Sequence, residues 1–149
     1  MDKLFAFDPG GTTGWALFTY ADGQVVDKGQ VDFASIFDWL NDMEGHLPTT
    51  IAIVVEDFRL MGGKAKAQTG SRFETVQVIG AIRQWASKYH THILLQPPSI
   101  KPIAERWTGL HPVGSHANSH WVDAVNHGSY YLRQVGHYTT KLEGGGYIA

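Results

Sequence analysis

Runs of apolar residues separated by small or polar turns predict a three-stranded meander at the start of the chain. Residues 3–8 form a short apolar run that ends in Asp8, and residues 14–20 form a second run after a glycine-rich turn. The turn Ala21-Asp22-Gly23 is of the D-G hairpin type and leads into a third strand at about residues 24–32. We therefore expect three consecutive antiparallel strands.

The next part of the pattern predicts a helix and two further strands. A helix that Ser35 or Asp32 can cap should end near Gly45. Its apolar face would consist of Ile36, Phe37, Leu40 and Met43. Residues 51–55 form a continuous, mostly β-branched run that is typical of a central parallel strand, and residues 93–95 form a short strand.

Helical periodicity dominates the remainder of the chain. A helix over about residues 72–88 has an apolar side that includes Val76 and Ile79, and shorter helical patterns cover residues 99–107 and 116–134. The fold class is therefore α/β. We expect a five-stranded mixed sheet, made of the antiparallel meander plus two parallel strands and flanked by helices.

Length and composition limit the classes of protein that fit. The 149 residues suit one domain over residues 1–140, followed by a flexible tail over residues 141–149. The chain has no cysteine, so any metal must be held by oxygen or imidazole. No signal peptide and no stretch near the roughly 20 apolar residues of a membrane span is apparent. We expect a cytoplasmic protein, in a bacterial cell or a phage-infected host.

Charge is distributed unevenly along the chain. The formal net charge is -2, but residues 57–106 contain eight lysines and arginines against three acids, a local charge of about +5. Such a segment can follow a phosphate backbone. A solvated basic face without a partner is the alternative interpretation.

The strongest chemical signal of the first strands is the carboxylate at the start of the glycine-rich turn. Asp8 is followed by Pro9, Gly10 and Gly11, which let another backbone approach closely, and Gly14 follows three residues later. An ordinary hairpin turn explains this segment as well as a metal or phosphate site does.

Polar residues also gather on one side of the last predicted helix. His116, His120, Asp123 and His127 are spaced so that all four share a face, and His120 and Asp123 lie one turn apart. A helical histidine is more often a surface or core residue than a ligand. Together with Asp8 and with Glu56 at the end of the central strand, His120 and Asp123 nevertheless suit a divalent cation. Two Mg²⁺ or Mn²⁺ ions held about 4 Å apart by carboxylates hydrolyse phosphodiesters.

These residues resemble the RuvC-type Holliday junction resolvases of the ribonuclease H-like superfamily. The resemblance rests on Asp8-Pro9-Gly10 after the first strand, on Glu56 after the central strand and on His120-x-x-Asp123-Ala124 in the last helix. Pro98-Ser99-Ile100-Lys101 and Thr108-Gly109 are similar to two further family motifs, so the likeness spans residues 4 to about 132. No single motif is decisive, but their order and spacing are specific.

The resemblance implies a ribonuclease H-like fold and a metal-dependent endonuclease that acts as a homodimer and nicks two strands of a four-way DNA junction symmetrically. Asp8 would bridge two metal ions, Glu56 and Asp123 would each hold one, and His120 would ligate a metal or orient the water. The match also selects Glu56 over Asp57. The region from Arg59 to Arg83 would bind the junction and form the dimer. The candidate DNA contacts are Thr12, Thr13, Arg59, Lys64, Lys66, Arg72 and Lys101.

The chain departs from the family pattern at two places. Residues 110–116 replace a lysine-rich stretch of many members, and His120 stands where many members have aspartate, which should alter metal preference. Phe58 and Phe73 are candidates for an aromatic wedge that opens the junction, although core packing also explains them. The small size favours a phage-encoded enzyme.

Three other functions would account for part of these sequence features. A phosphotransferase of the actin type uses a similar hairpin for nucleotide phosphates, but it needs two large domains, so no nucleotide cofactor is expected. A non-catalytic nucleic-acid-binding protein would need only the basic segment. Another ribonuclease H-like nuclease, specific for branched DNA or for RNA–DNA hybrids, is the nearest alternative.

Overall fold

The computed structural model describes residues 1–47, 50–58, 69–89, 91–112 and 119–137, with only the backbone at residues 69–72. The strands are β1 (Lys3–Asp8), β2 (Thr12–Thr19), β3 (Val25–Asp32), β4 (Ile51–Glu56) and β5 (Ile93–Gln96). The helices are α1 (Ile36–Met43), α2 (Thr69–Ser87), α3 (Lys101–Thr108) and α4 (His120–Gln134), with the short 3-10 turns η1 (Glu44–His46) and η3 (Pro98–Ile100).

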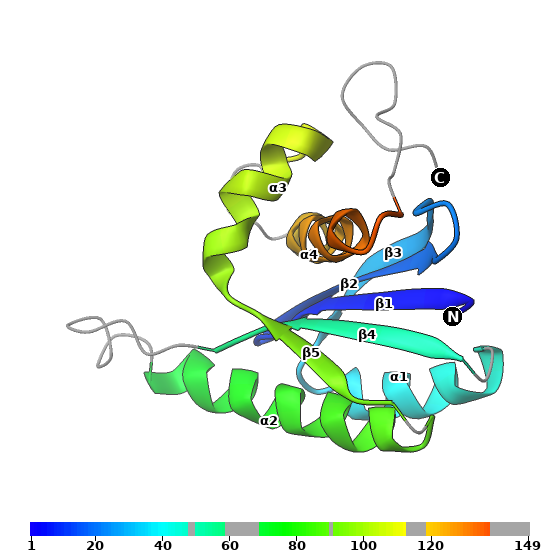
Figure 1. Ribbon diagram of the computed structural model, residues 1–149. Coiled ribbons are helices and arrows are strands. Elements are labelled where there is room, and N and C mark those ends of the chain that lie inside the picture. The colour runs from blue at the N-terminus through cyan, green and yellow to red at the C-terminus, as the bar shows by residue number, and fades with distance from the viewer. Residues whose placement is uncertain (48–49, 59–68, 90, 113–118, 138–149) are drawn as a thin grey trace.

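The described strands form a five-stranded mixed sheet in the order β3-β2-β1-β4-β5 (Figure 1). β1, β2 and β3 pair antiparallel through short turns, and β4 runs parallel to both β1 and β5. This arrangement confirms the expected fold class. It also places the carboxyl ends of β1 and β4 beside each other in the middle of the sheet.

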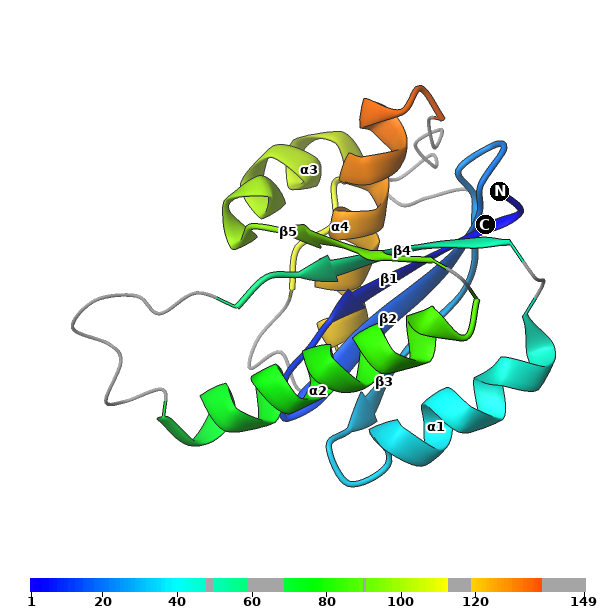
Figure 2. The ribbon, with the colours of Figure 1, turned by 60° about the horizontal axis from the view of Figure 1, so that its bottom comes forward.

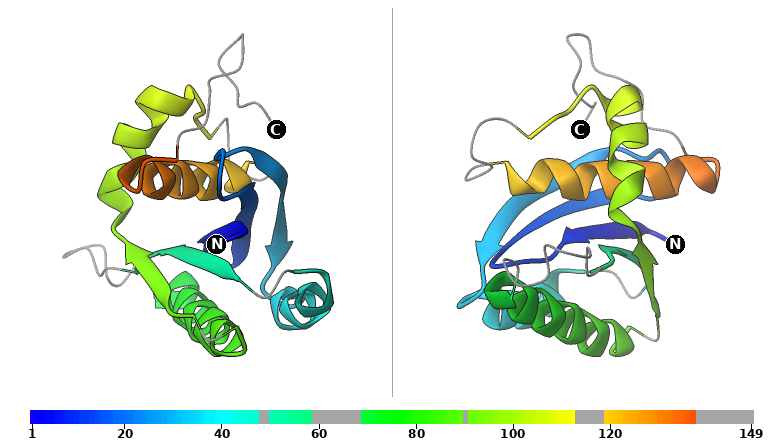
Figure 3. Two further views of the ribbon diagram at one scale, coloured as in Figure 1. Left: turned by 45° about the vertical axis from the view of Figure 1, so that its right-hand side comes forward. Right: turned by 90° about the vertical axis from the view of Figure 1, so that its left-hand side faces the viewer.

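Helices cover both faces of the sheet. α1 and α2 lie on one face, and α4 lies across the other face with α3 beside it (Figures 2 and 3). Alternation along the strands supplies both faces with apolar side chains. Phe5 and Phe7 of β1 pack toward α1 and α2, whereas Leu4 and Ala6 pack toward α4. All four are fully buried.

Glycines allow α4 to lie very close to the sheet. A Cβ atom at Gly14 in β2 would overlap the backbone carbonyl of His120, and one at Gly128 in α4 would overlap the ring of Phe18. Neither overlap can be relieved by rotating a flexible side chain, because one partner is backbone and the other a buried aromatic ring. These two contacts fix the height of α4 above β1 and β2.

Several local predictions need correction. Phe37 and Val76 were expected on apolar helix faces, but they are 42% and 50% exposed. Hydrophobic periodicity identifies a helical face without showing how far the neighbouring element extends over it. Asp32 accepts a hydrogen bond from the backbone N–H of Ser35, while the Ser35 side chain makes no capping bond.

Element boundaries also differ modestly from the sequence pattern. The helical pattern at residues 99–107 is divided between η3 and α3, and Gly109 ends α3 with a φ of 69°, as expected of a C-terminal cap. α4 begins at His120, while residues 113–118 and the expected tail over residues 141–149 lie outside the described residues. No helix in the described part of the chain is long and apolar enough to cross a membrane.

Candidate active site

The strand register brings two of the predicted carboxylates together. Phe7 of β1 is paired with Val55 of β4, so Asp8 and Glu56 follow as neighbours at the carboxyl ends of two parallel strands. Both continue the side of the sheet that carries Ala6 and Val54, which faces α4. Asp8 and Glu56 are joined by a side-chain hydrogen bond.

Helix α4 adds the third carboxylate from above this edge. Asp123 lies in the first turn of α4 and is 6% exposed. Position 127 is one turn further on and points to the same side, as the spacing of four residues requires. The close approach of α4 to β2 at Gly14 therefore sets the distance between Asp123 and the strand ends.

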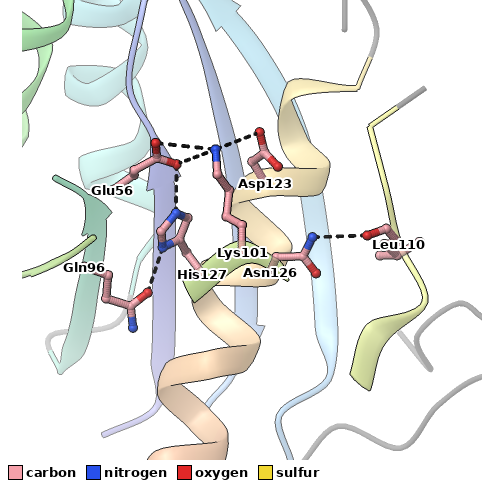
Figure 4. A network of polar contacts seen from close by, with 7 residues as sticks. All are labelled: Glu56, Gln96, Lys101, Leu110, Asp123, Asn126 and His127. Atoms are coloured by element: carbon pink, nitrogen blue, oxygen red, sulfur yellow. Dashed lines mark hydrogen bonds and ion pairs between the residues drawn. The ribbon is translucent and has the colours of Figure 1, made fainter. Parts of the chain in front are cut away.

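A lysine lies between two of these carboxylates, those of Glu56 and Asp123 (Figure 4). Lys101 begins α3, and its Nζ atom is 3.1 Å from Glu56 Oε2 and 3.4 Å from Asp123 Oδ2. Burial alone would lower the pKa of Lys101, but the charges of Glu56, Asp8 and Asp123 raise it above its usual value. Lys101 is therefore a firmly charged counter-ion at the centre of the acidic site.

The carboxylates of Asp8 and Glu56 respond in opposite ways to this environment. Burial, followed by repulsion from Glu56, raises the pKa of Asp8 well above its usual value, against the opposing influence of Lys101. Burial also acts to raise the pKa of Glu56, but the hydrogen bond from His127 and the charge of Lys101 lower it to about 2. In the protein alone, Asp8 therefore holds a proton to higher pH than Glu56 does.

His127 contacts the site from inside the core. Its Nε2 atom is 2.8 Å from Glu56 Oε2, its Nδ1 atom is 2.8 Å from Gln96 Oε1, and the side chain is 0% exposed. Gln96 is the register partner of Glu56 on β5. The spacing along the sequence predicted that His127 shares a helical face with Asp123, but it did not predict the contact with Glu56. Gln96 carried no functional signal.

A second polar network supports the turn that follows α3. The Thr108 hydroxyl donates to Asn126 Oδ1 at 2.6 Å and accepts from the Leu110 backbone N–H at 3.0 Å. Asn126 Nδ2 donates to the Leu110 carbonyl at 3.2 Å (Figure 4). Asn126 and Thr108 are fully buried. The Thr108-Gly109 motif thus fastens α3, and with it Lys101, to α4.

The glycine-rich turn between β1 and β2 is held by its own side chains. Thr13 is fully buried, and its hydroxyl accepts a hydrogen bond from the Gly10 backbone N–H at 3.4 Å, so it supports the turn from within. Thr12 is half-buried. Glu74 of α2 approaches so closely that a Cβ atom at Gly11 would lie 2.6 Å from its Oε2 atom.

The remaining predicted site residues lie outside this cluster or outside the described residues. His120 is the first residue of α4; its backbone N–H donates to Gln30 Oε1 at 3.2 Å, and its side chain is half-buried. Arg59, Lys64 and Lys66 lie outside the described residues, as does His116, and of Arg72 only the helical backbone is described. Within the part of the chain that the structure describes, no three histidine, aspartate or glutamate side chains are arranged as a set of metal ligands.

The fold of this chain has counterparts among solved structures. No family model and no curated protein matches the chain. The structure of Thermus thermophilus RuvC in complex with a Holliday junction substrate matches with a TM-score of 0.62 and 14% identity, over 92% of this chain and 98% of that chain. Thermus thermophilus RuvC in another structure matches with a TM-score of 0.58 and 14% identity, over 91% and 97%.

A viral protein with the same fold also matches. The Fowlpox virus resolvase in complex with its substrate Holliday junction DNA has a TM-score of 0.59 and 12% identity, over 88% of this chain and 99% of that chain. Coverage is nearly complete in all three comparisons. The chain therefore has the ribonuclease H-like fold of RuvC, and the match extends over nearly the full length of all three solved chains.

Proposed function

We propose that this protein is a metal-dependent, structure-selective endonuclease that resolves four-way DNA junctions by paired symmetric nicks. The observation that carries the proposal is the meeting of the Asp8, Glu56 and Asp123 carboxylates around one cationic group, the ammonium of Lys101. Both the RuvC and the poxvirus resolvase with this fold were solved with Holliday junction DNA, which supports branched DNA as the substrate.

The donor set at this site fits hard divalent cations, Mg²⁺ or Mn²⁺. Three carboxylates offer oxygen ligands, and Lys101 balances only part of their charge. Asp8 would bridge two ions, Glu56 and Asp123 would each hold one, and His120, one turn before Asp123, would add an imidazole that favours Mn²⁺. Bound ions of this kind activate a water molecule and stabilise the departing oxygen.

The residues around the carboxylates have separate tasks in this proposal. With cations bound to the carboxylates, Lys101 would be able to contact a DNA phosphate, and Thr12 at the hairpin would be able to bind the same strand. Gly10, two residues after Asp8, has no Cβ and would let a sugar–phosphate backbone approach, whereas Glu74 occupies the space beside Gly11. Arg59, Lys64, Lys66 and Arg72 follow Glu56 in the chain, and we propose that they bind backbone phosphates of the junction.

Paired nicks also require two active sites. One chain has one cluster of the Asp8, Glu56 and Asp123 carboxylates in its described residues. A homodimer would present two such clusters, related by a two-fold axis, to the two strands of a junction. We therefore propose that the active form is a homodimer.

Cleavage of defined DNA substrates tests the proposal. A synthetic four-way junction, a linear duplex and an RNA–DNA hybrid are incubated with the protein and with Mg²⁺ or Mn²⁺. We expect paired nicks in the junction alone. Asp8→Asn should abolish cleavage but bind the junction in EDTA as the wild type does, because the amide keeps the size of the side chain and removes its charge.

The control variant is Asp42→Asn, which changes an exposed carboxylate on α1, on the opposite face of the sheet. It should cleave at the wild-type rate. Equal cutting of linear duplex would contradict junction selectivity, cutting of the hybrid alone would identify a ribonuclease H, and an active Asp8→Asn variant would remove Asp8 from the catalytic site.

A further inference from the structure

The imidazole of His127 links the Glu56 carboxylate at the end of β4 to the side chain of Gln96 on β5. It bridges Glu56 Oε2 and Gln96 Oε1, with 2.8 Å on each side, and it is completely buried. Glu56 lies on β4, Gln96 on β5 and His127 on α4. Three elements of the fold are thus joined at one ring (Figure 4).

Packing alone does not explain a histidine at this position. The buried cluster between α4 and the sheet is otherwise apolar and includes Ala124 and Leu132 of α4 and Val54 of β4. A buried polar ring costs free energy unless both of its nitrogens are paired, whereas an apolar side chain of similar volume would carry no such cost. Both nitrogens of His127 are paired, one with Glu56 and one with Gln96, which offsets this cost.

The direction of the hydrogen bond to Glu56 follows from the acceptor. A carboxylate only accepts, so His127 Nε2 carries a proton and donates it to Oε2. With Gln96 Oε1 facing it, Nδ1 also carries a proton; with the Gln96 amide turned over, the amide N–H donates to Nδ1 instead. In the described part of the chain, Gln96 Nε2 has no other hydrogen-bond partner. In both arrangements Glu56 Oε2 accepts a hydrogen bond from His127 Nε2–H.

We propose that His127, held in place by Gln96, is a positioning residue that fixes the Glu56 carboxylate for cation binding. One oxygen of Glu56 is anchored to the core, which restricts rotation of the carboxylate before a cation arrives. Asp123 lies one turn earlier on the same helix. α4 therefore supplies one proposed ligand directly and orients a second one. This role rests on the proposed function, because it assumes that Glu56 binds a divalent ion.

Hydrogen bonds to a ligating side chain affect metal affinity even though they do not touch the metal. Removing such a partner commonly lowers affinity or activity by about 10–100-fold. The same interaction contributes here to the lowered pKa of Glu56, which keeps that carboxylate ionised. Loss of the Glu56–His127 contact should therefore lower the affinity of the protein for Mn²⁺ in the absence of DNA.

Calorimetric titration of the full chain with Mn²⁺, without DNA, tests the proposal. His127→Leu removes the donor and should weaken Mn²⁺ binding by about 10–100-fold. His127→Gln can keep an N–H donor near the same place and should recover part of the affinity. Gln96→Leu leaves the ring without its second partner and should give an intermediate loss. Junction binding in EDTA should be unchanged in all three variants.

The matched control is Ser129→Ala on the same helix. Ser129 is buried, and its hydroxyl has no hydrogen-bond partner among the described residues, so its removal should leave Mn²⁺ affinity unchanged. In a Glu56→Gln background, His127→Leu should add little further loss, because the two substitutions remove the same interaction. A fully additive loss would contradict the proposal.

A merely structural role gives a different pattern. His127→Leu and Gln96→Leu would then lower the melting temperature while the folded variants bound Mn²⁺ as tightly as the wild type, and the inference would be overturned. The proposed function fails separately if the wild type binds Mn²⁺ and leaves junctions uncut. A wild type that binds no Mn²⁺ would overturn both.

Discussion

Replacing Gly14 by alanine should displace the amino end of α4 and with it the acidic site. The new Cβ atom would lie 2.8 Å from the Trp121 nitrogen and closer still to the His120 carbonyl. Ordinary van der Waals contact begins at about 3.4 Å, so the backbone must withdraw by more than an ångström. Packing an extra methyl group into such a place costs about 1–3 kcal/mol of unfolding free energy. A shift of that size at a catalytic group costs about 100-fold in rate.

Urea unfolding and junction cleavage measure the two effects. Gly45→Ala is the matched control, because Gly45 lies in the 3-10 turn η1, outside the region expected to bind the junction, and a Cβ atom there meets nothing within 4 Å. Alanine loses less backbone entropy on folding than glycine, so Gly45→Ala should keep or slightly raise stability and leave cleavage unchanged. A Gly14→Ala variant with wild-type stability and wild-type cleavage would refute the close packing of α4 on β2.

Three further results are expected. Thr108→Val leaves Asn126 Oδ1 and the Leu110 N–H unpaired and should cost about 1–3 kcal/mol in urea unfolding, while Thr108→Ser should restore most of it; an unaffected valine variant would contradict the buried network. His120→Asp should keep cleavage and shift the preference from Mn²⁺ toward Mg²⁺; unchanged metal dependence would exclude His120 as a ligand. In EDTA, the raised pKa of Asp8 means that the folded protein holds a proton that the unfolded chain loses above pH 3.8. Acidification from neutral pH toward 3.8 should therefore stabilise the wild type more than Asp8→Asn, and equal slopes in urea unfolding would show that Asp8 is not perturbed.

Hydrophobic patterning was sufficient to predict the framework of the fold. The run at residues 51–55 indicated a central parallel strand, and the apolar runs with short turns indicated the antiparallel meander; both are present. Asp8 and Glu56 could be anticipated as neighbours, because carboxyl ends of parallel strands meet at one edge. Exposure of Phe37 could not be anticipated, since a helical stripe does not show how far its partner reaches.

The inner polar contacts of the site depend on geometry that the sequence does not display. Selecting His127 requires both the β4–β5 register, which pairs Glu56 with Gln96, and the line along which α4 crosses the sheet. Lys101 was predicted as a phosphate contact, and its ion pairs with Glu56 and Asp123 follow only from the position of α3. The DNA contacts assigned to Arg59, Lys64 and Lys66 remain predictions, because these residues lie outside the described ranges.

The distant origins of the three carboxylates have a consequence for the order of folding. Asp8, Glu56 and Asp123 come from near the start, the middle and the last described helix of the chain, so the cluster depends on contacts between residues far apart in sequence. During synthesis, β1–β4 emerge before α4, and until α4 docks, the face carrying Leu4, Ala6 and Val54 lacks its cover. A chain interrupted before residue 120 would thus be prone to aggregate and would lack Asp123. The proposed cleavage activity would therefore be confined to chains that have been completed through α4.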